Sequence, residues 1–128
     1  MIVTNARNPR FNSAINPRFN SAINPRFNSA INPRFNSAIN PNITACISGL
    51  YLFDWQTQQL SGFAVPANAM TFVVFDTKLN FSGISTKATD NVYAWFNAES
   101  VYVGEWVVAS ASAYIIFNES MQSVGVAT

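Results

Sequence analysis

Residues 72–84 read FVVFDTKLNFSGI, and degenerate copies of this phrase fill most of the chain beyond residue 45. The other copies are LYLFDWQTQQLSGF at 50–63, YAWFNAESVYVGEW at 93–106 and YIIFNESMQSVGV at 114–126. Each copy runs from aromatic and β-branched residues to an Asp or Asn, then through a polar stretch to a glycine. Aromatic and β-branched residues suit a pleated surface, and Asp and Asn cap their own turns. The phrase therefore predicts a β-hairpin.

The period of this repeat is 21 residues, marked by Gly62, Gly83, Gly104 and Gly125. In this register the chain divides into units at 45–65, 66–86, 87–107 and 108–128, and one column is aromatic: Tyr51, Phe72, Tyr93 and Tyr114. The glycines indicate either a β-bulge or the close approach of a neighbouring backbone. The pair Phe53-Asp54 comes one residue early, so the first turn should be one residue longer. We expect the segments PANAM, KATDN and VASAS to be short linkers between hairpins.

Four hairpins predict an all-β domain of about eight strands, and no segment has a sustained helical period. Apolar residues occupy adjacent strand positions, so both strand faces need cover that one unit cannot supply alone. The fourth unit has no polar capping change. We therefore expect a closed arrangement with pseudo-four-fold symmetry. The alternative is an open stack of hairpins, whose uncovered edges would pair with other chains.

The hairpin phrase resembles the unit of the four-fold β-flower family, small bacterial proteins with four hairpins about a central axis. The resemblance covers residues 45–128. It implies an all-β fold of four hairpin repeats. It implies no activity, because that family has none established.

A second repeat precedes the hairpins: the octapeptide NPRFNSAI occurs four times without substitution over residues 8–39. Asn-Pro disfavours helix for the Asn, so helix is interrupted every eight residues. FNSAI could form a very short strand with Phe, Ser and Ile on one face, but five residues bury too little to offset backbone ordering. We expect residues 1–44 to be an extended or flexible arm.

Each octapeptide offers one arginine and one phenylalanine, giving eight candidate contact residues: Arg10, Phe11, Arg18, Phe19, Arg26, Phe27, Arg34 and Phe35. Four identical binding motifs on one chain would raise avidity, because binding of one motif increases the effective concentration of the others. Arginine beside phenylalanine could also bind phosphates and stack on bases, but one basic residue in eight is sparse for a nucleic-acid partner. A recent tandem duplication would produce the same identity with no function attached.

Charge is scarce and unevenly placed. Only 10% of residues are charged and 49% are apolar, so the chain depends on packing apolar faces within itself or against copies of itself. Residues 1–40 carry five arginines and no acid, a net of +5. Residues 41–128 carry two lysines against six acids, a net of −4. The two halves are expected to attract each other, at a strength that salt reduces.

The sequence lacks the usual chemistry of enzymes and metal sites. It has no histidine, which removes the commonest general base, and a single cysteine, Cys46, which rules out an intrachain disulfide and the usual zinc ligand sets. Cys46 shares a column with Ala67, Ala88 and Ala109, so we expect it to be buried. We expect the carboxylates to be turn caps or exposed turn residues. We expect no enzyme activity and no cofactor. No leader or membrane-spanning run is visible, so a cytoplasmic location is the default expectation.

The aromatic residues supply the remaining candidate site: Trp55, Trp95 and Trp106. Trp95 lies in an apolar column, whereas Trp55 falls in the first turn and Trp106 aligns with Ala64, Ser85 and Ala127. Core packing or an assembly interface is the favoured interpretation. We therefore predict a non-enzymatic structural or interaction module that self-assembles through its arm and strand edges. The alternative is a carbohydrate-binding module that uses Trp55 and Trp106.

Overall fold

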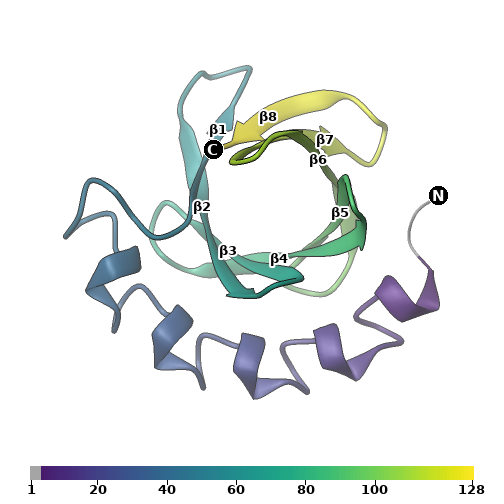
Figure 1. Cartoon of the computed structure of the whole chain (residues 1–128), viewed down its shortest axis with the longest axis horizontal. Helices are drawn as coiled ribbons and strands as arrows, with labels where there is room; N and C mark the ends of the chain where they lie inside the picture. The colour runs from purple at the N-terminus through teal and green to yellow at the C-terminus, as the bar shows by residue number, and fades with distance from the viewer. Residues whose placement is uncertain (1–3) are drawn as a thin grey trace.

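The structure, a computed structural model, describes residues 4–128 and contains a closed barrel of eight antiparallel strands (Figure 1). The strands are β1 (Leu50–Asp54), β2 (Leu60–Asn68), β3 (Thr71–Asp76), β4 (Phe81–Thr89), β5 (Val92–Asn97), β6 (Tyr102–Ser110), β7 (Ala113–Asn118) and β8 (Ser123–Ala127). Each strand pairs with its neighbours in the chain, and β8 closes the barrel against β1 through Leu52↔Ala127 and Asp54↔Gly125. The prediction of a closed all-β arrangement is confirmed. The open stack is not observed.

Long polar turns connect the strands at one end of the barrel, and two-residue turns connect them at the other. The short turns are residues 69–70, 90–91 and 111–112. The prediction of linkers at PANAM, KATDN and VASAS is wrong for their first three residues, which belong to the nine-residue strands β2, β4 and β6; the last two residues of each form the short turn. These strand ends were not predicted, because their side chains are mostly small. Their backbones still pair, as in Pro66↔Phe72 and Asn68↔Thr71.

The predicted caps of the long turns are confirmed. Asp76 Oδ1 accepts hydrogen bonds from the amides of Lys78 and Asn80, both at 2.9 Å. Asn97 Oδ1 accepts from the amides of Glu99 and Val101, both at 3.0 Å. Each long turn also holds one residue at positive φ, spaced 21 residues apart: Gln58, Leu79, Ser100 and Met121.

Gly83 illustrates why each long turn is followed by glycine. It pairs with Val74 on β3 and with Asn97 on β5, and the β3–β4 register shifts immediately after Val74. A Cβ on Gly83 would overlap the carbonyl oxygen of Phe96. The sequence left open a bulge or a close backbone approach, and both occur here.

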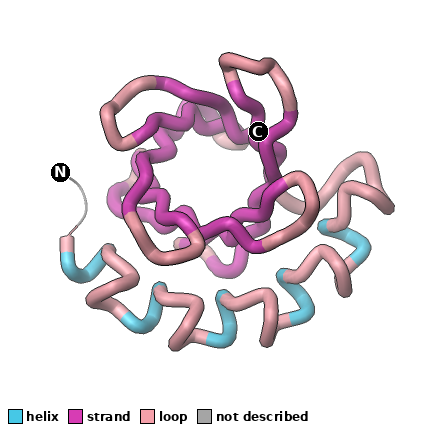
Figure 2. The backbone as a smooth tube through the Cα atoms, turned by 180° about the vertical axis from the view of Figure 1, so that it is seen from behind, coloured by secondary structure: helices cyan, strands magenta, loops and turns pink. Residues whose placement is uncertain are grey.

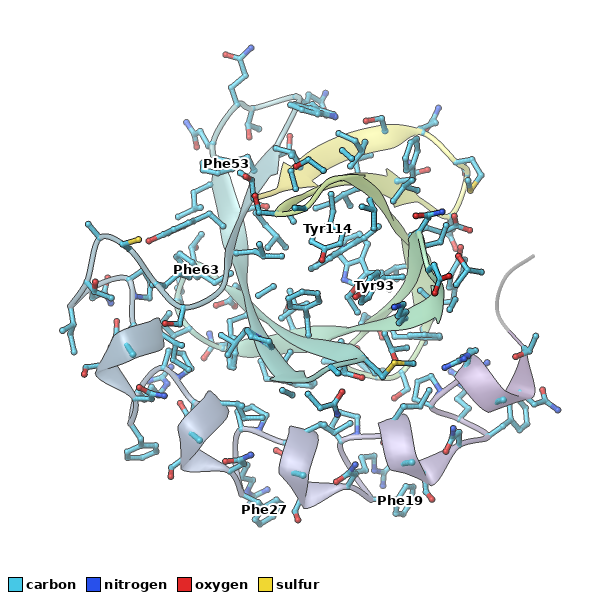
Figure 3. All side chains as sticks on the ribbon, in the orientation of Figure 1. Phe19, Phe27, Phe53, Phe63, Tyr93 and Tyr114 are labelled. Atoms are coloured by element: carbon cyan, nitrogen blue, oxygen red, sulfur yellow. The ribbon has the colours of Figure 1, made fainter. Side chains whose placement is uncertain are left out.

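The barrel interior is filled by alternate residues of each strand, with Trp106 at its centre. Trp106 is 0% exposed. At the corresponding positions of β2, β4 and β8 stand small, fully buried residues: Ala64, Ser85 and Ala127. Three small side chains leave room near the axis for one indole. The rings of Phe72 and Tyr114 pack on it, with centroids 5.9 and 6.1 Å away. Tyr93 and Tyr114 point into the barrel in Figure 3.

Tyr51 does not belong to this interior, although it aligns in the sequence repeat with the interior residues Phe72, Tyr93 and Tyr114. The longer first turn shifts β1 by one residue, so Leu50 faces inward opposite Ala64 and Tyr51 faces outward. Tyr51 packs edge-on against Phe63, and its hydroxyl donates to the Ala45 carbonyl oxygen at 2.7 Å.

The octapeptide arm follows the outside of the barrel past β2, β3 and β4 (Figures 1 and 2). It contains five short 3-10 helices: η1 (Asn5–Arg7), η2 (Ser13–Ile15), η3 (Ser21–Ile23), η4 (Ser29–Ile31) and η5 (Ser37–Ile39). Of the two predicted alternatives, the extended arm is therefore wrong, and the flexible arm stays a prediction. Ser-Ala-Ile of each octapeptide forms a helical turn, and Pro-Arg-Phe forms another turn.

Asparagine side chains link consecutive octapeptides and make this compact form possible. Asn16 Nδ2 donates to the Pro9 carbonyl oxygen at 3.0 Å, and Asn16 Oδ1 accepts from the Arg18 amide. Asn20 does the same with Ala14 and Ala22. The ladder repeats as far as Asn36, which donates to the Ala30 carbonyl oxygen at 2.8 Å. Backbone groups that lack sheet partners are thus satisfied by side-chain amides.

The arm packs on the barrel through its isoleucines and prolines. Ile23, Ile31 and Ile39 are buried against Val65 and Phe75 on the outer face of β2 and β3. The octapeptide prolines are buried too. This burial was missed from the sequence, because an octapeptide considered alone has nothing to pack against.

Candidate functional site

The outer face of the arm carries the predicted arginine and phenylalanine residues, here called the Arg–Phe row: Arg10, Phe11, Arg18, Phe19, Arg26, Phe27, Arg34 and Phe35. Its four phenylalanines are 68% to 76% exposed. Phe19 and Phe27 point away from the barrel in Figure 3. Large apolar side chains at this exposure, repeated along one surface, make the row a candidate interaction site.

Two arginines lie over their neighbouring rings. The Arg18 guanidinium carbon is 6.0 Å from the Phe19 ring centroid, and that of Arg26 is 5.6 Å from the Phe27 centroid. Contacts of this kind are cation–π interactions. They pair a positive charge with an apolar ring at the same surface position. Each arginine–phenylalanine pair can therefore offer a charge and an apolar ring to one partner.

The arm contacts its own barrel mainly through apolar side chains, not through the charge attraction expected from the sequence. Arg34 Nη2 donates to the Lys78 carbonyl oxygen at 3.3 Å and to Asn80 Oδ1 at 3.2 Å. Within residues 4–128, the one salt bridge joins Lys87 to Asp90 at 3.8 Å, and both partners belong to the barrel. The arginine charges thus remain uncompensated by carboxylates of the same chain.

The long-turn end of the barrel gathers negative charge. Each of its four turns carries one carboxylate: Asp54, Asp76, Glu99 and Glu119. Lys78 is the one base in these turns. Burial alone would raise the pKa of Asp76, but hydrogen bonds from the Asn80 and Lys78 amides outweigh it and hold the pKa below its ordinary value. This end of the barrel is therefore negative at neutral pH.

The structure does not bring the predicted tryptophans together as one exposed site. Trp106 lies in the barrel interior and has no surface for a ligand, so the interpretation of Trp106 as a sugar platform is wrong. Trp95 is partly buried, with its ring centroid 6.4 Å from that of Trp106. Trp55 alone projects outward, 47% exposed in the first long turn, and its Nε1 donates to Ser123 Oγ at 2.6 Å.

Cys46 is exposed, contrary to the prediction that it is buried. The cause is a fifth, degenerate octapeptide at 40–47, NPNITACI, that the sequence analysis missed. Cys46 takes the place of an exposed alanine such as Ala38, and Ile47 is buried against Phe63. The Asn-Pro start and the isoleucine eight residues after Ile39 were the signals that could have revealed it.

The described part of the chain contains no group of three side chains placed to hold a metal ion. Across residues 4–128, no helix has the length and apolar character needed to cross a membrane.

Comparisons with protein-family models, curated proteins and solved structures found no match. The class of the protein is therefore defined by its fold, an all-β closed barrel of eight antiparallel strands. Its resemblance to the four-fold β-flower family stays a prediction.

Proposed function

We propose that the protein is a non-enzymatic interaction module that self-associates, with the Arg–Phe row of one copy binding the acidic long-turn end of another copy's barrel. The observation that carries this proposal is the division of each octapeptide into two faces. The prolines of all four octapeptides are buried, as are Ile23, Ile31 and Ile39, while Ile15 is half-buried; the arginines and phenylalanines remain exposed. A row held on a rigid support loses little conformational entropy on binding.

The apolar gain from such binding is substantial. Fully burying a phenylalanine side chain contributes roughly 1.5–3 kcal/mol. Four equivalent side chains on one surface would add avidity, because the first contact raises the effective concentration of the others.

Charge gives this association its orientation. The arm carries a net of +5 and the rest of the chain −4. Opposite patches steer encounter and disfavour other orientations, over a screening distance of about 8–10 Å at physiological salt. The other predicted route, pairing of strand edges, has no support, because every strand of the described barrel is paired on both sides.

We also infer that the barrel consists of four copies of one 21-residue hairpin, as the sequence predicts. The capped long turn, its residue at positive φ and the glycine after it recur at that interval. Each copy would then contribute one long turn, and hence one carboxylate, to the acidic end.

The test is the solution mass of the full chain, measured by light scattering after gel filtration across a range of protein and salt concentrations. We expect a mass that grows with protein concentration and falls with salt. The variant F11S/F19S/F27S/F35S should be monomeric. A matched control is A14S/A22S/A30S/A38S, which also changes one exposed residue per octapeptide and should behave like the parent. A parent chain that is monomeric throughout would refute the proposal.

A carbohydrate-binding role is the second candidate, and Trp55 now carries it alone. Its exposed indole borders a shallow cavity of about 230 Å³ lined by polar residues, among them Asp54, Gln56 and Ser123. An aromatic face beside hydrogen-bonding groups suits a sugar ring. A glycan that changes the tryptophan fluorescence of the parent, but not of Trp55→Ala, would support this role. If no glycan in a panel changes the tryptophan fluorescence, the carbohydrate-binding role is contradicted.

A further inference from the structure

A cavity of about 260 Å³ opens at the long-turn end of the barrel. Its floor is formed by one residue from each odd-numbered strand, at corresponding positions: Leu52, Val74, Trp95 and Ile116. Asp54, Asp76, Ser61 and Ser82 line it nearer the rim. The cavity thus combines an apolar floor with a polar, negatively charged entrance, as ligand sites in the mouths of β-barrels do.

The floor contains a hydrogen-bond donor that nothing in the described chain satisfies. Trp95 Nε1 is buried and has no partner. Ser85 Oγ and Trp106 Nε1, also facing the interior, are buried without partners as well, and Ser85 pairs directly with Trp95 in the β4–β5 register. Buried donors are almost always paired in proteins. Of these three residues only Trp95 lines the cavity, and its N–H indicates that an acceptor from outside the chain belongs beside the floor.

The rim has acceptor capacity left over. Asp54 Oδ1 accepts from the amides of Gln56 and Thr57, and Asp76 Oδ1 caps its own turn. A carboxylate has about four acceptor positions, so both can bind a further donor. Glu99 and Glu119 in the other two long turns strengthen the negative potential at the entrance, against the positive charges of Lys78 and of Arg34, which reaches the β3–β4 turn.

We propose that the barrel mouth binds a small organic cation: an ammonium group on a compact aromatic or aliphatic body that also carries a hydrogen-bond acceptor. The ammonium pairs with Asp54 and Asp76, and the body covers Leu52, Val74 and Ile116. The acceptor takes the N–H of Trp95. The volume of the cavity restricts the ligand to a small molecule.

Tyramine is a suitable probe, because it has an ammonium, a ring and a hydroxyl oxygen. Tyrosol, which replaces the ammonium by a hydroxyl, is the uncharged control. The readout is the indole N–H signals of the three tryptophans in a nitrogen-15 NMR titration, assigned with Trp→Phe variants. We expect tyramine to shift the Trp95 signal most and to bind more tightly than tyrosol.

The variant D54N/D76N tests the rim and keeps the Oδ1 caps of the turns, at the loss of the bond that Asp76 Oδ2 accepts from Asn80 Nδ2. Asn97 and Asn118 cap the equivalent turns with the same oxygen, so asparagine preserves the cap. Loss of two ion pairs should weaken tyramine binding about tenfold and leave tyrosol binding unchanged. Asp90→Asn, in a short turn at the opposite end of the barrel, is the matched control and should have no effect.

Three results would overturn the proposal: equal binding of tyramine and tyrosol, no response of the Trp95 signal, or equal losses in D54N/D76N and Asp90→Asn. The site shares Asp54 and Asp76 with the acidic end to which the Arg–Phe row is proposed to bind, so the two proposals are separated by a variant that lacks the row. The variant F11S/F19S/F27S/F35S retains the mouth, so tyramine binding by that variant reports on the cavity alone, and its solution mass reports on the arm alone.

Discussion

The side-chain amide of Asn20 donates to the carbonyl oxygen of Ala14, 2.6 Å away in the preceding octapeptide. Equivalent bonds join Asn28 to Ala22 and Asn36 to Ala30. With the Asn-to-Pro bonds they join successive turns, whose own backbone hydrogen bonds link only residues three or four apart. The arm therefore keeps its shape through side chains that lie between successive turns.

Breaking one of these bonds should loosen the arm locally. Asn28→Asp keeps the oxygen that accepts from the Ala30 amide but loses the donor to Ala22. The free energy of local opening should fall by about 0.5–1.5 kcal/mol, because the Ala22 carbonyl loses its partner and faces a carboxylate. Hydrogen exchange by mass spectrometry should show faster exchange in residues 21–32. Ser29→Ala, an exposed change next to it, should leave exchange unaltered; identical profiles for both variants would argue against the ladder.

The buried isoleucines should hold the arm to the barrel. Ile31→Ala removes a buried side chain that packs with Val65 and Val73, and should weaken docking of the arm by about 2–4 kcal/mol. Limited proteolysis should then cut within residues 8–39 more rapidly while the barrel resists. Phe27→Ala removes a larger but exposed side chain from the same octapeptide. Comparable protection in the two variants would contradict the assignment of inner and outer faces.

Gly104 should tolerate no side chain. A Cβ there would overlap the carbonyl oxygen of Phe117 on β7. Gly104→Ala should therefore lower the free energy of unfolding by about 3 kcal/mol or more, since two backbones must separate. Chemical denaturation followed by tryptophan fluorescence measures this. Ser112→Ala, in an exposed short turn, should change stability by less than about 0.5 kcal/mol; a similarly small loss in Gly104→Ala would refute the close approach.

Alkaline pH should destabilise the barrel through Tyr102. Burial, followed by its hydrogen bond to Glu105 and the charges of Glu105 and Glu119, raises the pKa of Tyr102 from 10.0 to about 12. Because the folded pKa exceeds the unfolded value, the stabilisation is complete below pH 10 and is lost as the pH rises toward 12.

The hydroxyl of Tyr102 donates to Glu105 Oε1 at 3.1 Å, so Glu105→Gln should lower the pKa of Tyr102. Absorbance of tyrosinate, titrated on the parent, Glu105→Gln and Tyr102→Phe, measures it. The last variant should lose the highest-titrating component and show a shallower decline of stability above pH 10. An unchanged titration in Tyr102→Phe would contradict the assignment.

The features that could be predicted from the sequence are those governed by neighbours along the chain. Asp76 and Asn97 cap turns with their own side chains, and the apolar runs beside them form strands, whichever way the sheet closes. Gly83 indicated a β-bulge or a close backbone approach, because glycine in a strand commonly marks such local geometry. The closed all-β arrangement followed because the apolar strand faces had no other cover.

The errors arose where a residue's environment depends on distant parts of the chain. Trp106 aligns with small residues in the other three repeats, and this difference suggested that its ring binds a ligand. In the barrel, three small residues from other strands leave a central space that its indole fills. Tyr51 shares a column with Tyr93, but one additional turn residue reverses the face it presents. A one-residue change always exchanges the two faces of a strand.

The local elements of this protein follow from neighbouring residues alone: the hairpin strands, the capped turns, and an octapeptide with one arginine and one phenylalanine at each repeat. Which face of each octapeptide is buried depends instead on the folded barrel. Isoleucine and phenylalanine have similar tendencies to leave water. The outer wall of β2 and β3 contacts only the isoleucines, since the asparagine-linked turns point them inward, and so the phenylalanines remain exposed.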